Sequence, residues 1–379
     1  MQSQQLTYSA NRWWSDVDAS TRLTRAQLVL VFGDRPTLAA GDYLAPLRVQ
    51  FPTAQVVSCS SGGDVLGASV SSEGLVATAV RFEECHVTAV EADIPSMEES
   101  ETTGAQLAAR LPAYDLRHVL VFAEGLHVNG SALAKGLSAH LPRGVSVTGG
   151  LAADGDRFER TLVGLNAVPG GRRAVAIGIY GAALKVGMGT FGGWEAFGDV
   201  YQITRSKGNV LQELDGRKAL ELYKALLGPM GYALPASGLL FPLKIRETND
   251  GPGVVRTILG VNEEEGSVTF AGDIPEGWSA RLVRTGLDEL IHAAGIAGGR
   301  AADGVSGESA RLALAVSCIG RKLLLQQRTR EELARVQSAL GGDTTLSGFY
   351  SYGELAPSSA SAECDLHNQT MTVTLLSEG

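Results

Sequence analysis

The sequence predicts an α+β fold with two domains, built from repeated strand–helix–strand–turn–strand units whose sheets are flanked by helices. One order of apolar runs, helix-compatible stretches and small-residue turns recurs three times along the chain. Each interval from first strand to turn is roughly 25–30 residues, about the length of one strand–helix–strand crossover. Predicted strands also outnumber predicted helices and lie close together, which favours sheets with helices on one face.

Each unit contains the same four elements in the same order. Apolar runs typical of strands begin the units, at residues 27–32, 118–122 and 312–318. Helix-compatible stretches follow, at residues 43–47, 131–137 and 330–336. Second apolar runs then end in turns of small residues and a carboxylate, at residues 56–64, 145–154 and 345–354. Further strands close the units, at residues 75–82, 174–180 and 371–376. Because similar turns recur at strand ends, we expect them to form one pocket.

The rest of the chain divides into a lead-in and two consecutive domains. Residues 1–23 are a polar lead-in with Trp13 and Trp14, which either cap a domain surface or dock a partner. Residues 24–214 form the first domain, with a helix in 95–111 whose acidic residues lie at its favourable end. The second domain, residues 215–379, begins near a helix that is stopped by Gly228 and Pro229. Its other expected segments are the helix at 217–227, strands at 239–245, 254–261, 268–271 and 280–284, a helix at 286–294 and a linker at 297–307.

Composition and charge argue against several classes of function. The chain has 379 residues, of which 44% are hydrophobic and 19% charged, as in ordinary globular proteins of two domains. A net charge of −9 and a pI of about 5.3 suit neither a nucleic-acid nor an anionic membrane partner. The first residues lack an apolar leader, and no apolar run approaches the ~18–20 residues that span a bilayer. We therefore expect a cytoplasmic protein.

A glycine-rich stretch at residues 187–192 fits the GxGxxG pattern of dinucleotide-binding loops. Such a loop needs a helix that opens at the turn and presents its N–H groups to pyrophosphate. Trp194 and the strand-like residues 201–204 follow instead, and no GxxxxGK[ST] loop exists. The pattern therefore does not indicate a nucleotide site.

An enzyme with Cys318 as its nucleophile is one alternative to a binding protein. Cys318 follows an apolar strand close to Arg321, and a nearby cation favours the thiolate. His367 is a candidate base if the fold brings it near. The simpler interpretation is a small core thiol beside a surface arginine. The four cysteines lack CxxC spacing, so neither a zinc site nor a disulfide framework is indicated.

Haem ligation is a second alternative, although no cofactor is the primary expectation. The six histidines show neither HxxxH nor HExxH spacing. His367 directly precedes a threonine-rich strand, and as an axial haem ligand it would need a large apolar cavity.

Several motifs in a fixed order make the chain resemble the FIST family, whose paired N-terminal and C-terminal domains are described as an intracellular sensory module. The resemblance covers nearly the whole chain. In the first half it rests on the strand through Phe32 and on residues 51–52, 58–63, 149–155, 158 and 161. In the second half it rests on residues 317–321, 348–355 and 366–372. Asp64 is a departure, because glutamate is more usual there.

The resemblance implies a sensor that binds a small polar ligand, with amino acids or their derivatives proposed for the family. It implies a signalling partner such as a histidine kinase, a cyclic-dinucleotide enzyme or a chemoreceptor. Some standalone members look like haem-based nitric oxide sensors, so the haem alternative stays open. Because the sequence shows no kinase, F-box or methyl-accepting region, we expect the standalone form.

We expect a non-catalytic site where the three turns converge. Backbone N–H groups of glycines can approach a ligand carboxylate closely, because glycine has no Cβ. Arg321 is expected to pair with that carboxylate, and Asp154 or Glu354 to receive an ammonium. Tyr350 and Tyr352 would add ring surface and hydroxyl groups. The full predicted site is Ser60, Ser61, Gly62, Gly63, Gly149, Gly150, Asp154, Cys318, Arg321, Tyr350, Tyr352 and Glu354.

Overall fold

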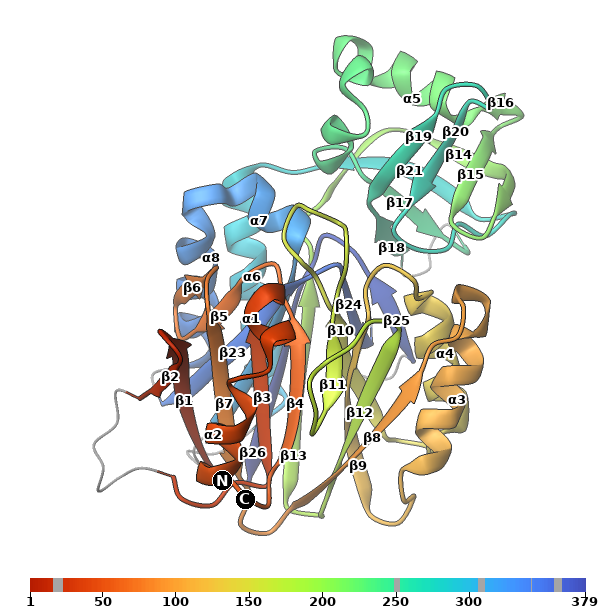
Figure 1. Ribbon diagram of the computed structural model, residues 1–379. Coiled ribbons are helices and arrows are strands. Elements are labelled where there is room, and N and C mark those ends of the chain that lie inside the picture. The colour runs from red at the N-terminus through yellow and green to blue at the C-terminus, as the bar shows by residue number, and fades with distance from the viewer. Residues whose placement is uncertain (16–22, 249–252, 306–310, 342, 358–362) are drawn as a thin grey trace.

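The computed structural model describes residues 1–15, 23–248, 253–305, 311–341, 343–357 and 363–379. Its described part contains three six-stranded sheets and one eight-stranded sheet, with helices between strands, which confirms the α+β class. The three six-stranded sheets belong to one body, and the eight-stranded sheet forms a smaller module at one end of it (Figure 1).

The three predicted units are confirmed. The first consists of β3 (Leu28–Gly33), α1 (Arg35–Ala40), α2 (Leu44–Gln50), β4 (Gln55–Ser60) and β7 (Leu75–Arg81). The second consists of β9 (Leu116–Ala123), α4 (Gly130–His140), β10 (Ser146–Leu151) and β12 (Arg173–Tyr180). The third consists of β22 (Arg311–Cys318), α7 (Ile319–Leu325), α8 (Thr329–Leu340), β23 (Thr344–Ser351) and β26 (Met371–Glu378). In each unit the first two strands pair in parallel, and the last strand is antiparallel to the first.

The units also exchange strands in a cycle. After its turn, the first unit supplies β5 (Asp64–Leu66) to the sheet of the third unit, where β5 pairs with β23. The third unit supplies β24 (Gly353–Pro357) to the sheet of the second, where it pairs with β10. The second supplies β11 (Val163–Leu165) to the sheet of the first, where it pairs with β4. The three turns therefore lie at the junctions between sheets.

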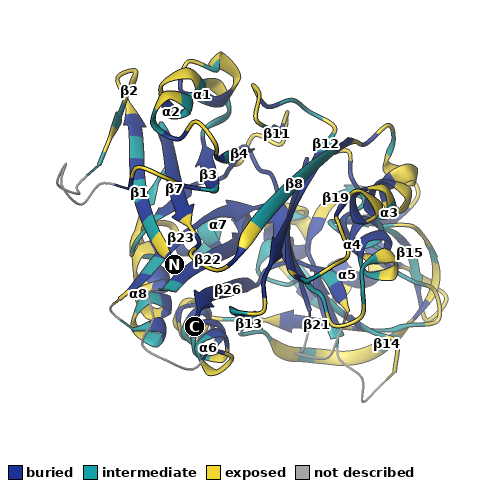
Figure 2. Cartoon of the chain, turned by 90° about the horizontal axis from the view of Figure 1, so that it is seen from below, coloured by how far each residue is buried: buried dark blue, intermediate teal, exposed yellow. Residues whose placement is uncertain are grey.

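The core explains why the strands that begin the units are continuously apolar. Phe32, Phe122 and Phe349, one from each unit, have ring centroids 4.7–5.9 Å apart in a cluster that all three units share. The other faces of the sheets carry separate apolar clusters, with α1 and α2, with α3 (Ser100–Arg110) and α4, and with α6 (Leu287–Asp303) and α8. Strands covered on both faces bury nearly every residue, as the dark blue strands of Figure 2 show.

The smaller module is inserted into the third sheet. It consists of β14 (Glu195–Lys207), β15 (Val210–Leu214), β16 (Arg217–Lys218), α5 (Ala219–Leu227), β17 (Leu243–Arg246), β18 (Gly253–Arg256), β19 (Ile258–Asn262), β20 (Ser267–Phe270) and β21 (Ser279–Arg284), with 3₁₀ turns η2 (Gly228–Ala233) and η3 (Ala236–Leu239). It lies between β13 (Leu184–Phe191) and α6, which both pack on β26. The predicted boundary at residues 214–215 falls inside this module. The boundary at residues 214–215 remains a prediction, and in space it falls between β15 and β16 of the inserted module.

The N-terminal lead-in is a part of the first sheet. Its strands are β1 (Gln2–Ser9), which pairs with β7, and β2 (Arg12–Trp14), while residues 16–22 lie outside the described ranges. Trp13 packs on Tyr8 and Tyr43, and its indole N–H donates to the Tyr43 carbonyl at 3.0 Å. Trp13 therefore caps this sheet, whereas Trp14 is about half exposed.

The structure corrects the predicted linker at 297–307 and explains the GxGxxG pattern at 187–192. The predicted linker at 297–307 is wrong over its first part, because α6 continues to Asp303. The GxGxxG stretch lies mostly in β13, and a Cβ on Gly187 or Gly189 would stand 1.9 Å from carbonyl oxygens of α6. These glycines therefore permit close helix–strand packing. The remaining described elements are β6 (Ser69–Ser71), β8 (His86–Asp93), η1 (Met97–Glu99), η4 (Gln326–Arg328) and β25 (Cys364–His367).

Candidate ligand-binding site

The turns of the three units meet in a ring of backbone hydrogen bonds. Each unit donates one N–H to the next unit around the cycle: Gly62 to Tyr350 O at 2.8 Å, Tyr352 to Leu151 O at 3.2 Å, and Ala153 to Ser60 O at 2.9 Å. The three acceptor residues also occupy equivalent positions in their units. In the parallel strand pairs, Ser60 lies opposite Gly33, Leu151 opposite Ala123, and Tyr350 opposite Ser317. The expectation that the turns converge is thus met for the backbone.

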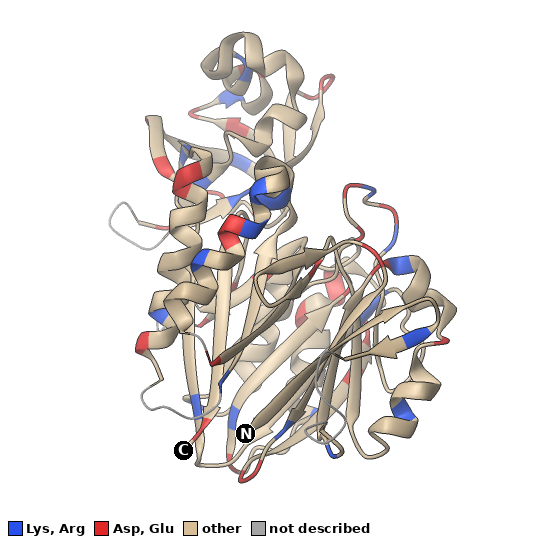
Figure 3. Ribbon diagram, turned by 90° about the vertical axis from the view of Figure 1, so that its left-hand side faces the viewer, with Lys and Arg blue, Asp and Glu red and all other residues tan. Residues whose placement is uncertain are grey.

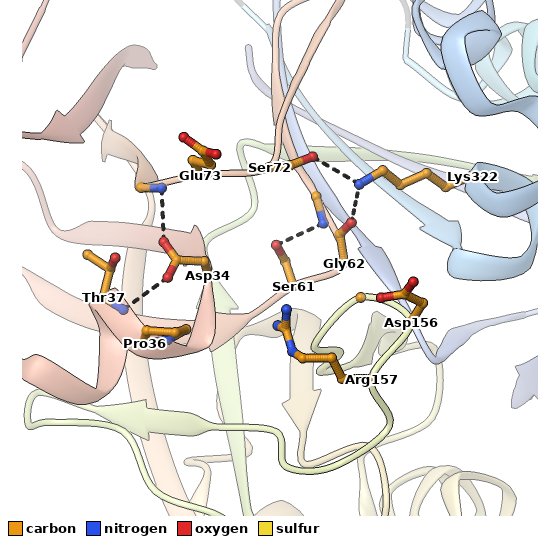
Figure 4. A pocket seen from close by; sticks show the side chains of 13 residues that line it. Asp34, Pro36, Thr37, Ser61, Gly62, Ser72, Glu73, Asp156, Arg157 and Lys322 are labelled. Atoms are coloured by element: carbon orange, nitrogen blue, oxygen red, sulfur yellow. Dashed lines mark hydrogen bonds between the residues drawn. The ribbon is translucent and has the colours of Figure 1, made fainter.

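A cavity of about 560 Å³ lies beside this ring and is lined by all three units (Figure 4). The third unit supplies Lys322 of α7, and the second unit supplies the loop 155–157. The first unit supplies the largest share: Asp34, Pro36, Thr37, Ser61, Gly62, Gly63, Ser72, Glu73 and Gly74. The volume of this cavity falls within the range usual for small-molecule sites, roughly 300–1,000 Å³.

Lys322 joins the third unit to the turn of the first. Its Nζ donates to the carbonyl oxygen of Gly62 and, at 3.0 Å, to the hydroxyl of Ser72. Burial lowers the pKa of Lys322, while Asp64 and Asp156 act in the opposite direction. Its ammonium is therefore a partly desolvated cation with two fixed partners.

Asp34 fixes the first-unit wall of the cavity. It is the N-cap of α1, and its Oδ1 accepts the N–H of Thr37 at 3.0 Å. Its Oδ2 accepts the N–H of Gly74 at 2.9 Å, which ties the loop before β7 to the start of the helix. The first bond caps an N–H of the first helical turn, which has no partner within the helix, and Pro36 suits that first turn.

Ser61 lies on the cavity wall above a buried carboxylate. Its Oγ donates to Asp64 Oδ1 and accepts the N–H of Gly63 at 3.1 Å. The pKa of Asp64 is raised to about 7, mainly by burial; the bond from Ser61 and the charge of Lys322 lower it, and the charge of Asp34 raises it.

The glycine N–H groups of the predicted site are already bonded within the protein. The Gly62 N–H reaches Tyr350 and the Gly63 N–H reaches Ser61. Gly149 and Gly150 lie inside β10, and a Cβ on Gly149, whose φ is +152°, would stand 1.8 Å from the carbonyl oxygen of Val121. This pattern of glycines serves strand packing. Ser60 is likewise internal, because its Oγ accepts the N–H of Leu162 at 2.9 Å.

Arg321 points away from the cavity into the third unit. It is fully buried, and its guanidinium pairs with Glu332 at 2.7 Å. It also donates to the carbonyl oxygens of Gly192 at 3.0 Å and Leu290 at 2.7 Å. The hydroxyl of Tyr350 donates to the same Glu332 at 2.8 Å. The expected bidentate contact of Arg321 with a ligand does not fit this position, and Lys322, the next residue, is the cation on the cavity.

The other predicted ligand contacts also have internal partners. The Tyr352 hydroxyl donates to Asp154 Oδ1, and its ring stacks on Phe158 with a centroid distance of 4.5 Å. Asp154 is buried and lies 3.4 Å from Arg35. Glu354 accepts from Ser351 at 2.7 Å and from the Thr370 hydroxyl at 2.8 Å, and burial raises its pKa to about 8.

Cys318 and His367 do not fit their alternative roles well. Burial, followed by the charge of Glu354, raises the pKa of the Cys318 thiol, which disfavours a thiolate. The Nε2 of His367 bonds the carbonyl oxygen of Ala356 at 2.9 Å, so that nitrogen is not free for an iron ligand, and the residue does not line the cavity. Within the described ranges, no group of three His, Cys, Asp or Glu residues is placed to hold a metal ion.

Of the residues predicted from the sequence, Ser61, Gly62 and Gly63 line the cavity, whereas most of its charged lining residues were not predicted. Asp34 carried a local signal, since an aspartate before Arg35-Pro36 is typical of a helix N-terminus. Lys322 and Arg321 are adjacent cations of the short helix α7, but only the side chain of Lys322 points to the cavity. Arg157 lies in a loop. No local pattern identifies such residues.

Comparison with known proteins supports the sensory class. A model of the FIST N domain matches residues 27–217, and a model of the FIST C domain matches residues 219–357. The chain therefore belongs to the FIST family, whose domains are recognised as small-ligand sensing domains of signalling proteins. The two family models meet inside the inserted module, near residue 218.

Other comparisons add little to this assignment. No curated protein matches the chain. A crystal structure of cyanuric acid hydrolase from A. caulinodans is similar at 11% identity and a TM-score of 0.32, covering 93% of this chain and 90% of the other. A second cyanuric acid hydrolase structure has 10% identity and a TM-score of 0.34, covering 100% and 99%. Similarity this weak carries no functional argument.

The described helices and charges bear on possible partners. None of the helices in the described ranges is both long and apolar enough to cross a membrane. Along the described ribbon in Figure 3, segments coloured for acidic residues alternate with segments coloured for basic residues.

Proposed function

We propose that this protein is a non-catalytic sensor that binds a small zwitterionic molecule, an amino acid or a close derivative, in the cavity beside the ring of turns. The observation that carries this proposal is the cavity itself, because Lys322 of the third unit faces lining residues from the other two units. A single small ligand in this position would contact all three units.

The charges around the cavity suit a ligand that carries both signs. Lys322 and Arg157 can pair with a carboxylate, while Asp34, Glu73 and Asp156 can receive an ammonium. A fully anionic ligand would meet three carboxylates, and a purely apolar one would leave polar groups without partners. The hydroxyls of Ser61, Ser72 and Thr37 add neutral hydrogen-bonding groups on the same wall.

Because residues of all three units line the cavity, a bound ligand could change how the units are arranged, and that change would be the signal. A ligand that bonds Lys322, the first-unit turn and the 155–157 loop stabilises the arrangement in which the three lie close together. A partner that distinguishes this arrangement from a looser one receives the signal. We expect that partner to be a histidine kinase or a cyclic-dinucleotide enzyme, as the family resemblance implies.

A thermal-unfolding screen against amino acids and their derivatives tests the proposal. At least one compound should raise the Tm of the wild-type protein, because a ligand that binds only the folded state stabilises it. Lys322→Met should abolish that rise. Lys135→Met is the matched control, since Lys135 lies on α4, pairs with Glu101 at 3.0 Å and does not line the cavity. If no compound raises the Tm, the ligand class is wrong.

A further inference from the structure

The hydroxyl of Ser61 has a fixed direction in the present structure. Its hydrogen is given to Asp64 Oδ1, and its oxygen accepts the N–H of Gly63 at 3.1 Å. A serine oxygen can accept two hydrogen bonds and donate one. The remaining capacity of Ser61 is therefore one lone pair, and Ser61 lines the cavity.

Asp64 differs from its counterpart in the third unit. Ser61 and Asp64 have the same spacing as Ser351 and Glu354, and in both pairs the serine donates to the acid. Glu354 Oε2 also accepts from the N–H and hydroxyl of Thr370. Asp64 is only 1% exposed, yet its Oδ2 has no hydrogen-bond partner among the described residues. The unit next to the cavity thus keeps an unsatisfied buried carboxylate oxygen, and such groups are uncommon in proteins.

We propose that Asp64 sets which hydrogen-bonding group Ser61 offers to a ligand in the cavity, an inference that rests on the proposed function. With Asp64 ionised, the Ser61 hydrogen stays on the carboxylate and the Ser61 lone pair selects a ligand N–H. With Asp64 protonated, the acid donates its hydrogen to Ser61, and the Ser61 hydrogen turns to a ligand carboxylate. The proton comes from solvent, and no covalent bond changes.

The charged groups that act on Asp64 allow both states near neutral pH. Burial is the main cause that raises the pKa of Asp64 to about 7, and the bond from Ser61 lowers it. The charge of Asp34 disfavours the ionised form, and the charge of Lys322 favours it. By linkage, a ligand that donates to Ser61 binds the ionised form, so its affinity rises as the pH rises through this value. A ligand that accepts from Ser61 binds the protonated form, so its affinity falls over the same interval.

Two probes with fixed charge separate the two directions. Pentylammonium and valerate keep their charges between about pH 6 and about pH 8. Calorimetric titration of the wild-type protein should show pentylammonium binding about three- to tenfold tighter at the higher pH, and valerate about three- to tenfold weaker. Asp64→Asn should remove both trends. Glu354→Gln is the matched control, because its carboxyl belongs to the equivalent pair away from the cavity and should leave both trends intact.

Ser61→Ala distinguishes the hydroxyl from simple charge attraction. If Ser61 transmits the effect, Ser61→Ala reduces the pH trends of both probes to less than about twofold. Trends of full size in Ser61→Ala, or in Asp64→Asn, would overturn the inference. The zwitterion 5-aminovalerate combines the charged groups of pentylammonium and valerate, which are its two half-probes. If 5-aminovalerate binds but the affinities of the two half-probes do not depend on pH, this inference alone is overturned. Failure of 5-aminovalerate and both half-probes to bind at either pH would overturn the inference and contradict the zwitterion-binding function together.

Discussion

The amide of Gly62 donates to the carbonyl oxygen of Tyr350 at 2.8 Å, which joins the turn of the first unit to the turn of the third. The amide of Tyr350 returns a bond of the same length to the carbonyl oxygen of Gly63. Because β5 continues from this turn into the third sheet, the first and third units cannot separate here without breaking β-sheet hydrogen bonds. Because the cavity lies next to this junction, a small shift of one unit relative to another would change the contacts of a bound ligand.

The second unit should contribute measurably to ligand affinity through Arg157. Arg157→Met removes the only cation that the 155–157 loop brings to the cavity lining described here, and we expect about a three- to tenfold rise in the Kd of the ligand found by thermal screening. Arg160→Met is a control in the same exposed loop, since Arg160 does not line the cavity. Equal Kd values for Arg157→Met and wild type would remove the second unit from the site.

Arg321 should affect stability and not ligand selection. Arg321→Met leaves the fully buried Glu332 without its ion-pair partner, and breaking a buried pair on one side costs about 3–5 kcal/mol in the free energy of unfolding. The double variant Arg321→Met/Glu332→Leu should lose less than Arg321→Met, because no uncompensated charge remains. Denaturant unfolding measures both. A single variant of wild-type stability that no longer binds ligand would restore the original expectation for Arg321.

Glu354 should make the protein less stable as the pH rises. Burial raises its folded-state pKa to about 8, whereas an unfolded glutamate titrates near 4.3. Between these values the folded state holds the proton and the unfolded state does not, so the free energy of unfolding falls by up to about 1.4 kcal/mol per pH unit from this group. Glu354→Gln should flatten the decline between about pH 5 and about pH 7. An unchanged slope in this variant would mean that Glu354 is ionised in the folded protein.

Cys318 should be unreactive in the folded protein. Its thiol is buried, and its pKa is raised by burial and by Glu354, so little thiolate is present at about pH 8. Iodoacetamide followed by peptide mass spectrometry should label Cys318 only after denaturation. Rapid labelling of the native protein, suppressed by a bound metabolite, would favour the alternative of an enzyme with a cysteine nucleophile.

Much of the body of the fold could be predicted from the sequence because its signals are local. The strands that begin and close the units are apolar runs, and helices such as α3 and α8 carry their charge and periodicity within one segment. The exchange of β5, β11 and β24 between sheets could not be predicted, because these are strands of three to five residues whose partners lie in other units. The insertion of the smaller module could not be predicted either, because short connections join it to β13 and α6 and no local sequence signal marks them.

The candidate site was predicted only where backbone and side chain gave the same signal. Ser61, Gly62 and Gly63 form a turn in sequence and also line the cavity. Gly149, Gly150 and Glu354 have similar local sequences, but the cyclic exchange of strands buries them between sheets. The choice between Arg321 and Lys322 depends on how α7 is turned against β22, which is a tertiary property.

A crystal structure of the protein with the compound that raises its Tm most would show directly where the ligand binds. We expect electron density for one small molecule within hydrogen-bonding distance of Lys322 Nζ, Ser61 Oγ and the 155–157 loop. Density elsewhere, for example around His367 or within the inserted module, with an empty cavity beside Lys322, would contradict it.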